Sequence, residues 1–267
     1  MGTAFGEIVT FMPGALAPEV TTEPATDIEG TTATLAGTAN PNGTEATGWF
    51  RYGDAEPEVC DDSFGARAPS SGGVALGAGT AATPFGEALS GLEPSSTYFY
   101  CAAASNLGGA TFGEVASFTT AAVPPSVRTS EPVVDALGAV TLGGAADPNG
   151  SEATGWLRYD SVEPDACDDT FGTRVPADGV SLGAGRDEVP FSELVADLAP
   201  GTYYVCALAS NEAGVATGEL LAFEIPEAPP AGGCGCRTVS ARSMPLIGVL
   251  PIAGLILLAL RRRRRRA

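Results

Sequence analysis

Six cysteines and a complete lack of histidine limit the chemistry that this sequence can carry. Without histidine, no Ser-His-Asp or Cys-His site can form and no imidazole can act as a base or bind a metal. Two cysteines lie near the C-terminal end, and the other four fall into two pairs: Cys60 and Cys101, and Cys167 and Cys206. The chemistry that remains is that of disulfides, free thiols and carboxylates.

Carboxylates surround the first cysteine of each pair. Such groups could ligate Ca²⁺ or serve as the acid and base of a glycosidase. The D-x-D-x-D-G calcium loop is missing, however, and a glycosidase needs a cleft that a small module rarely supplies. We therefore interpret these acids as solvated turn residues, and we expect no enzyme activity, no metal and no cofactor. They are Glu56, Glu58, Asp61 and Asp62 near Cys60, and Glu163, Asp165, Asp168 and Asp169 near Cys167.

Charge is distributed unevenly along the chain. All 32 acidic residues lie at or before Glu227, in a part that contains only six arginines. The other eight arginines follow residue 236, and there is no lysine. A strongly acidic surface repels nucleic acid and anionic lipid, so nucleic acid is excluded as a partner.

An internal repeat with a period near 105 residues organises the chain. Asn40–Tyr52 returns as Asp147–Tyr159 with its Gly-Trp pair intact, and Cys60–Gly65 returns as Cys167–Gly172. Thr97–Cys101 likewise returns as Thr202–Cys206. This period is too long for a solenoid unit and matches one small domain.

Each repeat reads as short alternating strands separated by turn signals. In the first repeat the pattern predicts strands over residues 31–38, 46–52, 98–105 and 112–119, with a long irregular excursion over residues 53–79. Strands of this length and spacing favour an all-β fold made of two tandem β-sandwiches.

Alternation along these strands predicts which side chains face the core. If Tyr98 faces inward, so do Tyr100, Ala102 and Ala104, and Cys101 points to the outer face. On the strand before the excursion, Phe50 and Tyr52 face inward while Trp49 and Arg51 face outward. We expect a covered Trp49 to form a small second core.

The four internal cysteines are predicted to form one disulfide in each repeat. We expect the pairs Cys60–Cys101 and Cys167–Cys206, because each repeat carries its own complete set. Pairing between the repeats is less favoured, and a Cys₄ zinc site lacks any C-x-x-C spacing. Each bridge would hold its excursion over the outside of the sheet.

The later strands of both repeats resemble those of bacterial fibronectin type III domains. The shared features in the first copy are Leu92–Tyr98, Ala104–Asn106 and Phe118–Thr120, and the second copy has Leu198–Tyr203 and Ala209–Asn211. The resemblance implies fibronectin-III/immunoglobulin-like sandwiches in which Tyr98 and Tyr203 are the tyrosine corner. It implies little about function.

The C-terminal end reads as a membrane segment with a sorting motif. Residues 244–260 are apolar and free of charge, and the arginines of residues 261–267 follow, so this tail is expected to stay cytoplasmic. With Gly233, Cys234, Gly235 and Cys236 upstream, the tail resembles the myxobacterial MYXO-CTERM signal. That resemblance implies processing by a protease of the myxosortase type at Cys234 or Cys236. The alternative is a permanent membrane anchor.

These observations predict an exported protein of the cell envelope or cell surface. Residues 1–16 look like the last strand of a preceding, truncated repeat with its linker, because Gly6–Phe11 matches Gly113–Phe118. Repeats follow at 17–121 and 122–226, then a Pro/Gly/Cys linker at 227–243 with the sorting motif. We expect a non-catalytic protein whose repeats act in adhesion, with a surface protein or a glycan as ligand. The alternatives are a passive stalk presenting an upstream domain, or an enzyme whose hydrolase domain lies upstream.

Overall fold

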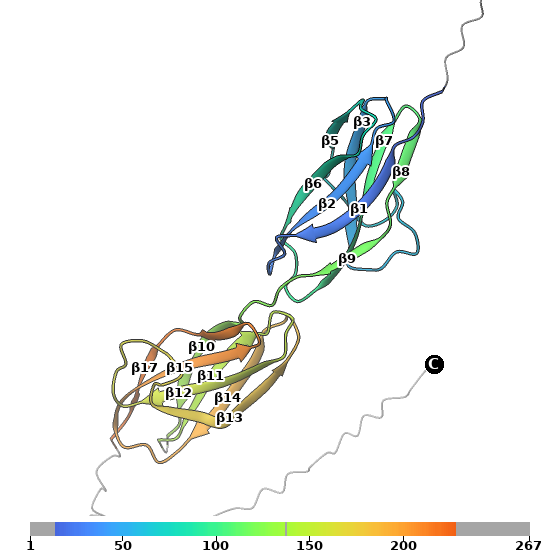
Figure 1. The fold of residues 1–267 in the computed structure, drawn as a ribbon. Coiled ribbons are helices and arrows are strands. Elements are labelled where there is room, and N and C mark those ends of the chain that lie inside the picture. The colour runs from blue at the N-terminus through green and yellow to red at the C-terminus, as the bar shows by residue number, and fades with distance from the viewer. Residues whose placement is uncertain (1–13, 137, 228–267) are drawn as a thin grey trace, which may run out of the picture. The chain divides into compact units, whose positions relative to one another are not determined.

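A computed structural model describes residues 14–136 and 138–227, and within them every regular element is a β-strand. The strands form two β-sandwiches, each made of two antiparallel sheets (Figure 1). This confirms the all-β class and the tandem sandwiches. The transmembrane helix predicted at 244–260 and the segment before residue 14 lie outside the described residues. Among the described residues no helix is long and apolar enough to cross a membrane.

The first sandwich contains nine strands. One sheet has the order β1-β2-β6, and the other has the order β4-β3-β7-β8, with β5 also paired to β3 and β9 to β7. The bounds are β1 Glu19–Thr26, β2 Thr32–Asn40, β3 Ala46–Gly53, β4 Ala66–Ala68, β5 Val74–Gly77, β6 Thr83–Ser90, β7 Thr97–Asn106, β8 Gly109–Phe112 and β9 Ala116–Thr119.

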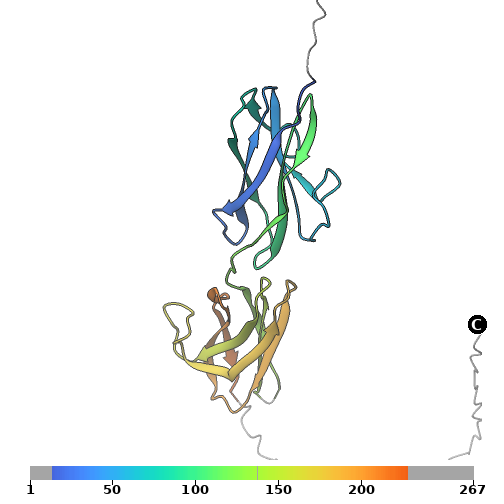
Figure 2. The same cartoon turned by 45° about the vertical axis from the view of Figure 1, so that its right-hand side comes forward.

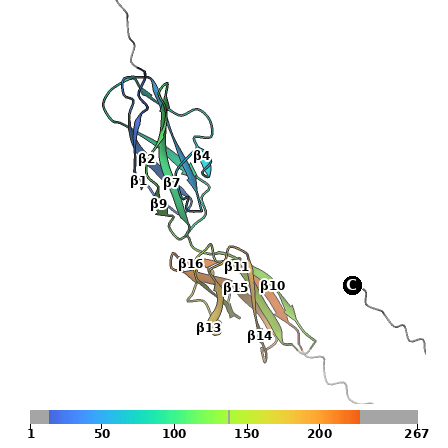
Figure 3. The same cartoon turned by 90° about the vertical axis from the view of Figure 1, so that its right-hand side faces the viewer.

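The second sandwich repeats this plan with eight strands. Its sheets have the orders β10-β11-β14 and β13-β12-β15-β16, and β17 pairs with β15. Figure 3 views this sandwich from another side, with β10, β11 and β14 labelled. The bounds are β10 Ser126–Val134, β11 Val140–Asp147, β12 Ala153–Asp160, β13 Thr173–Gly183, β14 Val189–Val195, β15 Gly201–Asn211, β16 Gly214–Thr217 and β17 Leu221–Ile225.

The main core of each sandwich lies between its two sheets. In the first sandwich Phe50, Tyr100 and Ala102 are fully buried there, and Tyr98 packs at the margin. Their neighbours on the same strands, Trp49 and Cys101, are buried outside this core. The predicted inward and outward alternation is therefore confirmed.

The last strand of each repeat is divided, which the sequence pattern did not predict. The expected single strand over 112–119 is instead β8 and β9, separated at Gly113. A side chain at Gly113 would meet Thr22 Oγ1 at 2.5 Å, because Thr22 of β1 inserts at this gap. The Thr22 hydroxyl accepts a hydrogen bond from Ala102 N at 3.0 Å and thereby joins the two sheets.

The same device divides β16 from β17 in the second sandwich. Thr129 of β10 accepts a hydrogen bond from Ala207 N at 3.0 Å and donates one to Glu219 O at 2.5 Å. A side chain at Gly218 would meet Thr129 N at 2.6 Å. The repeated Gly-Glu pairs, Gly113-Glu114 and Gly218-Glu219, therefore mark the place where the first strand of each sandwich packs against the last.

The excursion predicted as irregular is partly ordered into strands. In the first sandwich β4 and β5 both pair with β3, and in the second a continuous β13 pairs with β12. The longest segments without regular structure lie between β3 and β4 and between β12 and β13, and a short one separates β4 from β5. The first of these can be followed as the loop that stands out from the upper sandwich in Figure 2.

Side-chain amides hold the linker that leads into each sandwich. In the second sandwich Asn149 Nδ2 donates to Pro124 O at 2.7 Å and Asn211 Nδ2 donates to Val123 O at 2.8 Å. The first sandwich has the same pair of contacts at matching positions: Asn42 Nδ2 to Ala17 O, 2.7 Å, and Asn106 Nδ2 to Leu16 O, 2.8 Å. The repeated Asn-Gly turn and Ala-Ser-Asn motif thus fix how the chain enters.

Candidate functional site: the disulfide-pinned loops

The most distinctive chemistry in both repeats lies in the loop that follows β3 or β12. The structure has the disulfides Cys60–Cys101 and Cys167–Cys206, which are the two pairs that the sequence predicts. Each bridge joins the loop to a fully buried cysteine in the central strand of the larger sheet. The loop therefore crosses the outer face of that sheet, as expected.

A second, small core lies beneath the loop of the second sandwich. It consists of Trp156, Phe171, Cys206 and Leu208, and it is separate from the main core. In the first sandwich Trp49 is 6% exposed and packs edge-on against Phe112, with ring centroids 6.3 Å apart. Trp and cysteine thus share an apolar environment on the outer face. This confirms a second core in the second repeat, and the predicted Trp49 is buried outside the main core of the first.

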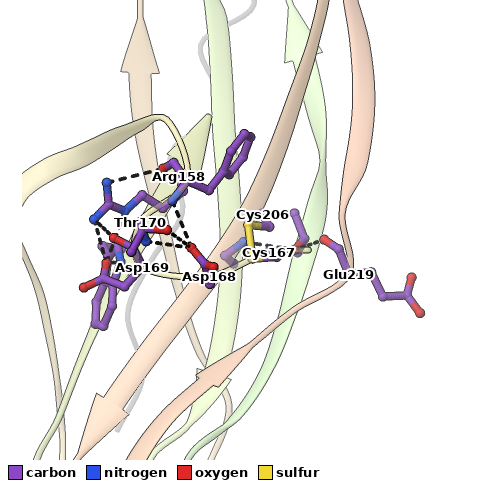
Figure 4. The surroundings of a disulfide bond; sticks show 11 residues. Arg158, Cys167, Asp168, Asp169, Thr170, Cys206 and Glu219 are labelled. Carbon is purple, nitrogen blue, oxygen red and sulfur yellow. Dashed lines mark hydrogen bonds and ion pairs between the residues drawn. A yellow bond between two sulfur atoms is a disulfide. The ribbon is translucent and has the colours of Figure 1, made fainter. Parts of the chain in front are cut away.

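The first aspartate after the loop cysteine folds the loop back on itself. Asp168 Oδ1 accepts hydrogen bonds from Thr170 N at 2.7 Å, Thr170 Oγ1 at 2.6 Å and Phe171 N at 3.0 Å (Figure 4). The Thr170 hydroxyl, followed by its backbone N–H, lowers the pKa of Asp168. Asp61 makes the matching turn, accepting from Ser63 N at 2.8 Å and Ser63 Oγ at 2.5 Å, and its pKa is lowered for the same reason.

The second aspartate ties the loop to the sheet. Asp169 Oδ1 accepts hydrogen bonds from Trp156 Nε1 at 2.9 Å and from Arg158 Nε and Nη2 at 3.1 and 2.9 Å. Figure 4 shows the Arg158 guanidinium turned toward this carboxylate. Arg174 completes the cluster, with its guanidinium 4.0 Å from the centroid of the Trp156 ring. Both arginines therefore neutralise charge within the loop region.

The first sandwich has the same residues in a looser arrangement. Arg51 Nη2 lies 3.2 Å from Asp62 Oδ1, and Arg67 stacks on Trp49 at 4.9 Å. Asp62 remains 65% exposed, and the buried Trp49 Nε1 has no hydrogen-bond partner. Asp62 matches the carboxylate that binds the indole in the second sandwich, but it contacts only the arginine.

A glycine ends the pinned turn in each loop. Gly172 has φ 45°, and a side chain there would meet Tyr159 O at 2.2 Å, so both its conformation and its close approach require glycine. Gly65 has φ 47° and lies equally close to Tyr52 O. The Asp-Asp-Ser/Thr-Phe-Gly segment is therefore a turn whose glycine allows it to lie close against the strand, β3 or β12.

Hydrogen bonds and ion pairs already engage four of the acids near the loop cysteines. Asp61 and Asp168 already accept hydrogen bonds from their own turns, and Asp62 and Asp169 bind arginines. The residues that the structure describes contain no group of three or more His, Cys, Asp or Glu that could hold a metal ion. The reading of these acids as turn residues is thus favoured, although for Asp62 and Asp169 the role is ion pairing.

The remaining predicted acids lie where each loop leaves the strand, and apolar side chains accompany them. Glu56 and Asp165 are exposed, and Tyr204 donates a hydrogen bond to Glu163 Oε2 at 3.3 Å. Val59 is 64% exposed and Val162 is 69% exposed. Each loop thus presents one valine and several carboxylates to solvent from a covalently fixed base.

The tyrosines assigned to the corner motif lie beside the final strand. Tyr98 Oη accepts a hydrogen bond from Glu93 N at 3.0 Å, which ties the preceding loop as predicted. Tyr98 stacks on Phe118, and Tyr203 stacks on Phe223, both with ring centroids 5.7 Å apart. Sequence reasoning missed a second role in this strand, in which Tyr100 Oη donates to Glu23 O at 2.7 Å. The second repeat has Val205 at that position, so repetition gave no signal for it.

The sorting residues predicted at the other end, Gly233, Cys234, Gly235 and Cys236, lie outside the described residues. The two sandwiches and their loops define a tandem of disulfide-stapled β-sandwich modules. Because disulfides form and persist in oxidising compartments, the bridges indicate an extracellular environment.

Comparison with known proteins identifies distant structural neighbours only. No family model and no curated protein matches the chain. A crystal structure of the chicken CNTN1 FN1–FN3 domains is 14% identical, with a TM-score of 0.41, over 77% of this chain and 64% of that chain. The sensor domain of the anti-sigma factor RsgI4 in Pseudobacteroides cellulosolvens is 19% identical, with a TM-score of 0.29, over 40% of this chain and 96% of that chain.

Proposed function

We propose that this is a non-catalytic cell-surface protein whose fibronectin-III-like repeats contact a protein or glycan ligand through the disulfide-pinned loops. Its C-terminal end, residues 233–267, anchors or sorts it at the envelope, with Cys234 or Cys236 as the processing position. The observation that carries the proposal is the way each loop is fixed while its tip stays exposed.

The loops combine the two properties that a contact surface needs. The disulfide, the aspartate turn and the Arg–Asp pair order the base of each loop before any ligand arrives. An ordered loop loses little conformational entropy on binding, so more of the contact energy appears as affinity. The exposed valines and carboxylates beside them would recognise a ligand with apolar and cationic or hydroxyl-bearing groups.

A binding assay on the full chain tests this proposal. The purified protein in nanodiscs is applied to a glycan array and to cells of the kind that produce it. If the loops make the contact, V59S/V162S weakens binding, because it removes only the exposed apolar groups. The matched control is L107S/L194S, which alters two exposed leucines away from these loops (91% and 65% exposed). Equal loss in both variants contradicts the role of the loops.

A passive stalk is the second candidate, favoured by the hydrogen bonds that hold the linker between the sandwiches. Under this alternative the original protein binds neither glycans nor cells, while its removal from the surface impairs an activity located in another domain. Mass spectrometry of the mature C-terminus tests the sorting proposal separately. An intact arginine tail in the mature protein would contradict processing.

A further inference from the structure

We propose that the linker between the two sandwiches is a fixed joint and that Arg186 is the side chain that locks it, so the two modules move as one body. This inference does not depend on the function proposed above. It rests on three observations: the linker is held from both sides, polar side chains bridge the two modules, and the residues that do so are specific to this junction.

The linker has almost no residue free to act as a hinge. On the side of the first sandwich, Ala121 N donates to Glu29 O at 3.2 Å, and Ala121 O accepts from Ser95 N at 3.3 Å. On the side of the second, Val123 O and Pro124 O are bound by the asparagine amides described above. Only Ala122 lies between the two anchored stretches, and prolines follow at 124 and 125, where they fix φ.

Arg186 crosses the junction with two hydrogen bonds. Its Nη2 donates to Pro94 O at 2.5 Å and to Ser96 Oγ at 2.6 Å, both in the loop before β7. Its Nε lies 3.8 Å from Glu93 Oε2, a pair that is exposed and therefore contributes little. The hydrogen bonds from a charged donor are the stronger contribution.

A pair of serines forms a second bridge. Ser95 Oγ and Ser151 Oγ lie 2.7 Å apart, and Ser151 is only 7% exposed. Ser151 also donates to Glu212 Oε1 at 3.3 Å. Separating the modules would expose Ser151 and leave it with Glu212 as its remaining partner, so the contact with Ser95 favours the joined arrangement.

The residues that make the joint are absent from the two outer ends of the tandem. In the first repeat, Thr80 occupies the position of Arg186, and Thr44 occupies that of Ser151. At the end of the second repeat, Ala199 replaces Glu93, and the loop is one residue shorter, without a counterpart of Ser95. Repeats that otherwise copy each other closely thus differ where they meet, which points to a contact that depends on this pairing.

Distance measurements between the modules test the joint in the full chain. Spin labels on noncanonical residues at Ala88 and Leu194, matching exposed positions of β6 and β14, leave every cysteine untouched. Pulsed dipolar spectroscopy in nanodiscs then gives a distribution of label separations. We expect one narrow distribution for the original chain and a broad one for R186T. A variant with Gly-Ser-Gly-Ser inserted after Ala122 shows how broad the distance distribution is when the linker is a free hinge.

R128T is the matched control, because Arg128 also occupies a position where the first repeat has threonine (Thr21), but it pairs with Glu188 of its own sandwich. It should keep the narrow distribution. An original chain as broad as the insertion variant overturns the fixed joint. An R186T distribution as narrow as that of R128T overturns the role of Arg186. Thermal unfolding of R186T checks that both sandwiches remain folded, since the change lies outside both cores.

Discussion

Replacing one disulfide should destabilise one sandwich and leave the other unchanged. The perturbation is C167A/C206A, which removes the staple of the second sandwich. Cys206 is fully buried in the small outer core, and alanine keeps its Cβ there without introducing a polar group. The remaining anchors of the loop, Asp169 with Arg158 and Phe171 in its pocket, stay in place. The change therefore reports mainly the covalent constraint.

The magnitude follows from the length of chain that the bridge closes. Cys167 and Cys206 are 39 positions apart, and closing a loop of this size removes unfolded-state entropy worth about 4 kcal/mol at 25 °C. A small domain has a total stability of about 5–15 kcal/mol, so the variant should still fold. For a module of ~100 residues, each kcal/mol lowers Tm by about 4–8 °C, which predicts a fall of roughly 15–30 °C.

Tryptophan fluorescence can assign the loss to one module. The chain has two tryptophans, one in each sandwich, so W156F leaves Trp49 to report on the first sandwich and W49F leaves Trp156 for the second. Urea unfolding of the full chain is followed under non-reducing conditions in each background. The free energy should fall only for the transition that Trp156 reports. C60A/C101A should show the mirror result, and C234S/C236S should change neither.

Two outcomes would refute this reasoning. A loss below about 1 kcal/mol would mean that the unfolded chain is already compact around the loop, so that closing it costs little entropy. Equal losses at both tryptophans would mean that the sandwiches unfold together rather than as separate modules. The second result would also bear on the joint at Arg186, because a strong junction couples the two transitions.

Three further outcomes follow from the loop and core contacts. Asp169→Ala should lower the free energy of unfolding in urea by about 1–3 kcal/mol, because it leaves the buried Trp156 N–H unpaired. Asp62→Ala should lower it by at most about 1 kcal/mol, since that carboxylate is exposed and binds only an arginine. Thr129→Val should lower the free energy of unfolding by about 1–3 kcal/mol, because the Ala207 N–H loses its hydrogen-bond acceptor between the sheets. The lowered pKa of Asp168 stabilises its turn fully above the ordinary value of 3.8, and this stabilisation is lost as pH falls below it.

Each of these outcomes has a direct check. Equal costs for the two aspartate variants would contradict the role assigned to the indole hydrogen bond. Thr217→Val, at an exposed position of β16, is the control for the buried threonine and should be nearly neutral. For the pH dependence, the amide signal of Thr170 is followed by NMR during acid titration. A midpoint at or above 3.8 contradicts a carboxylate held by its own turn.

The sequence predicted the features that depend on local alternation and on repetition. Trp49 and Phe50 are neighbours with opposite environments, and the period of two along a strand was enough to separate them. The disulfide pairs followed because each repeat has two internal cysteines and the repeats match. Both inferences need only the pattern of one segment or the comparison of two copies.

The features that the sequence could not predict depend on residues far apart in the chain. The division of the last strand at Gly113 depends on Thr22, which lies about ninety positions earlier and carries no signal of its own. The acids near Cys167 looked alike in sequence, yet Asp168 folds the turn while Asp169 binds Arg158 and Trp156. Their different roles arise from which way each carboxylate points once the bridge is formed.

The disulfides also limit how far the chain can lengthen under load. When a sandwich is pulled open from its ends, the chain between its two cysteines cannot extend, because the bridge carries the force past it. The bridge in the first sandwich spans 41 positions, which withholds about 140 Å of contour length. The second withholds a similar length. On unfolding under force, each bridged module would therefore extend by little more than half as much as an unbridged module of the same size.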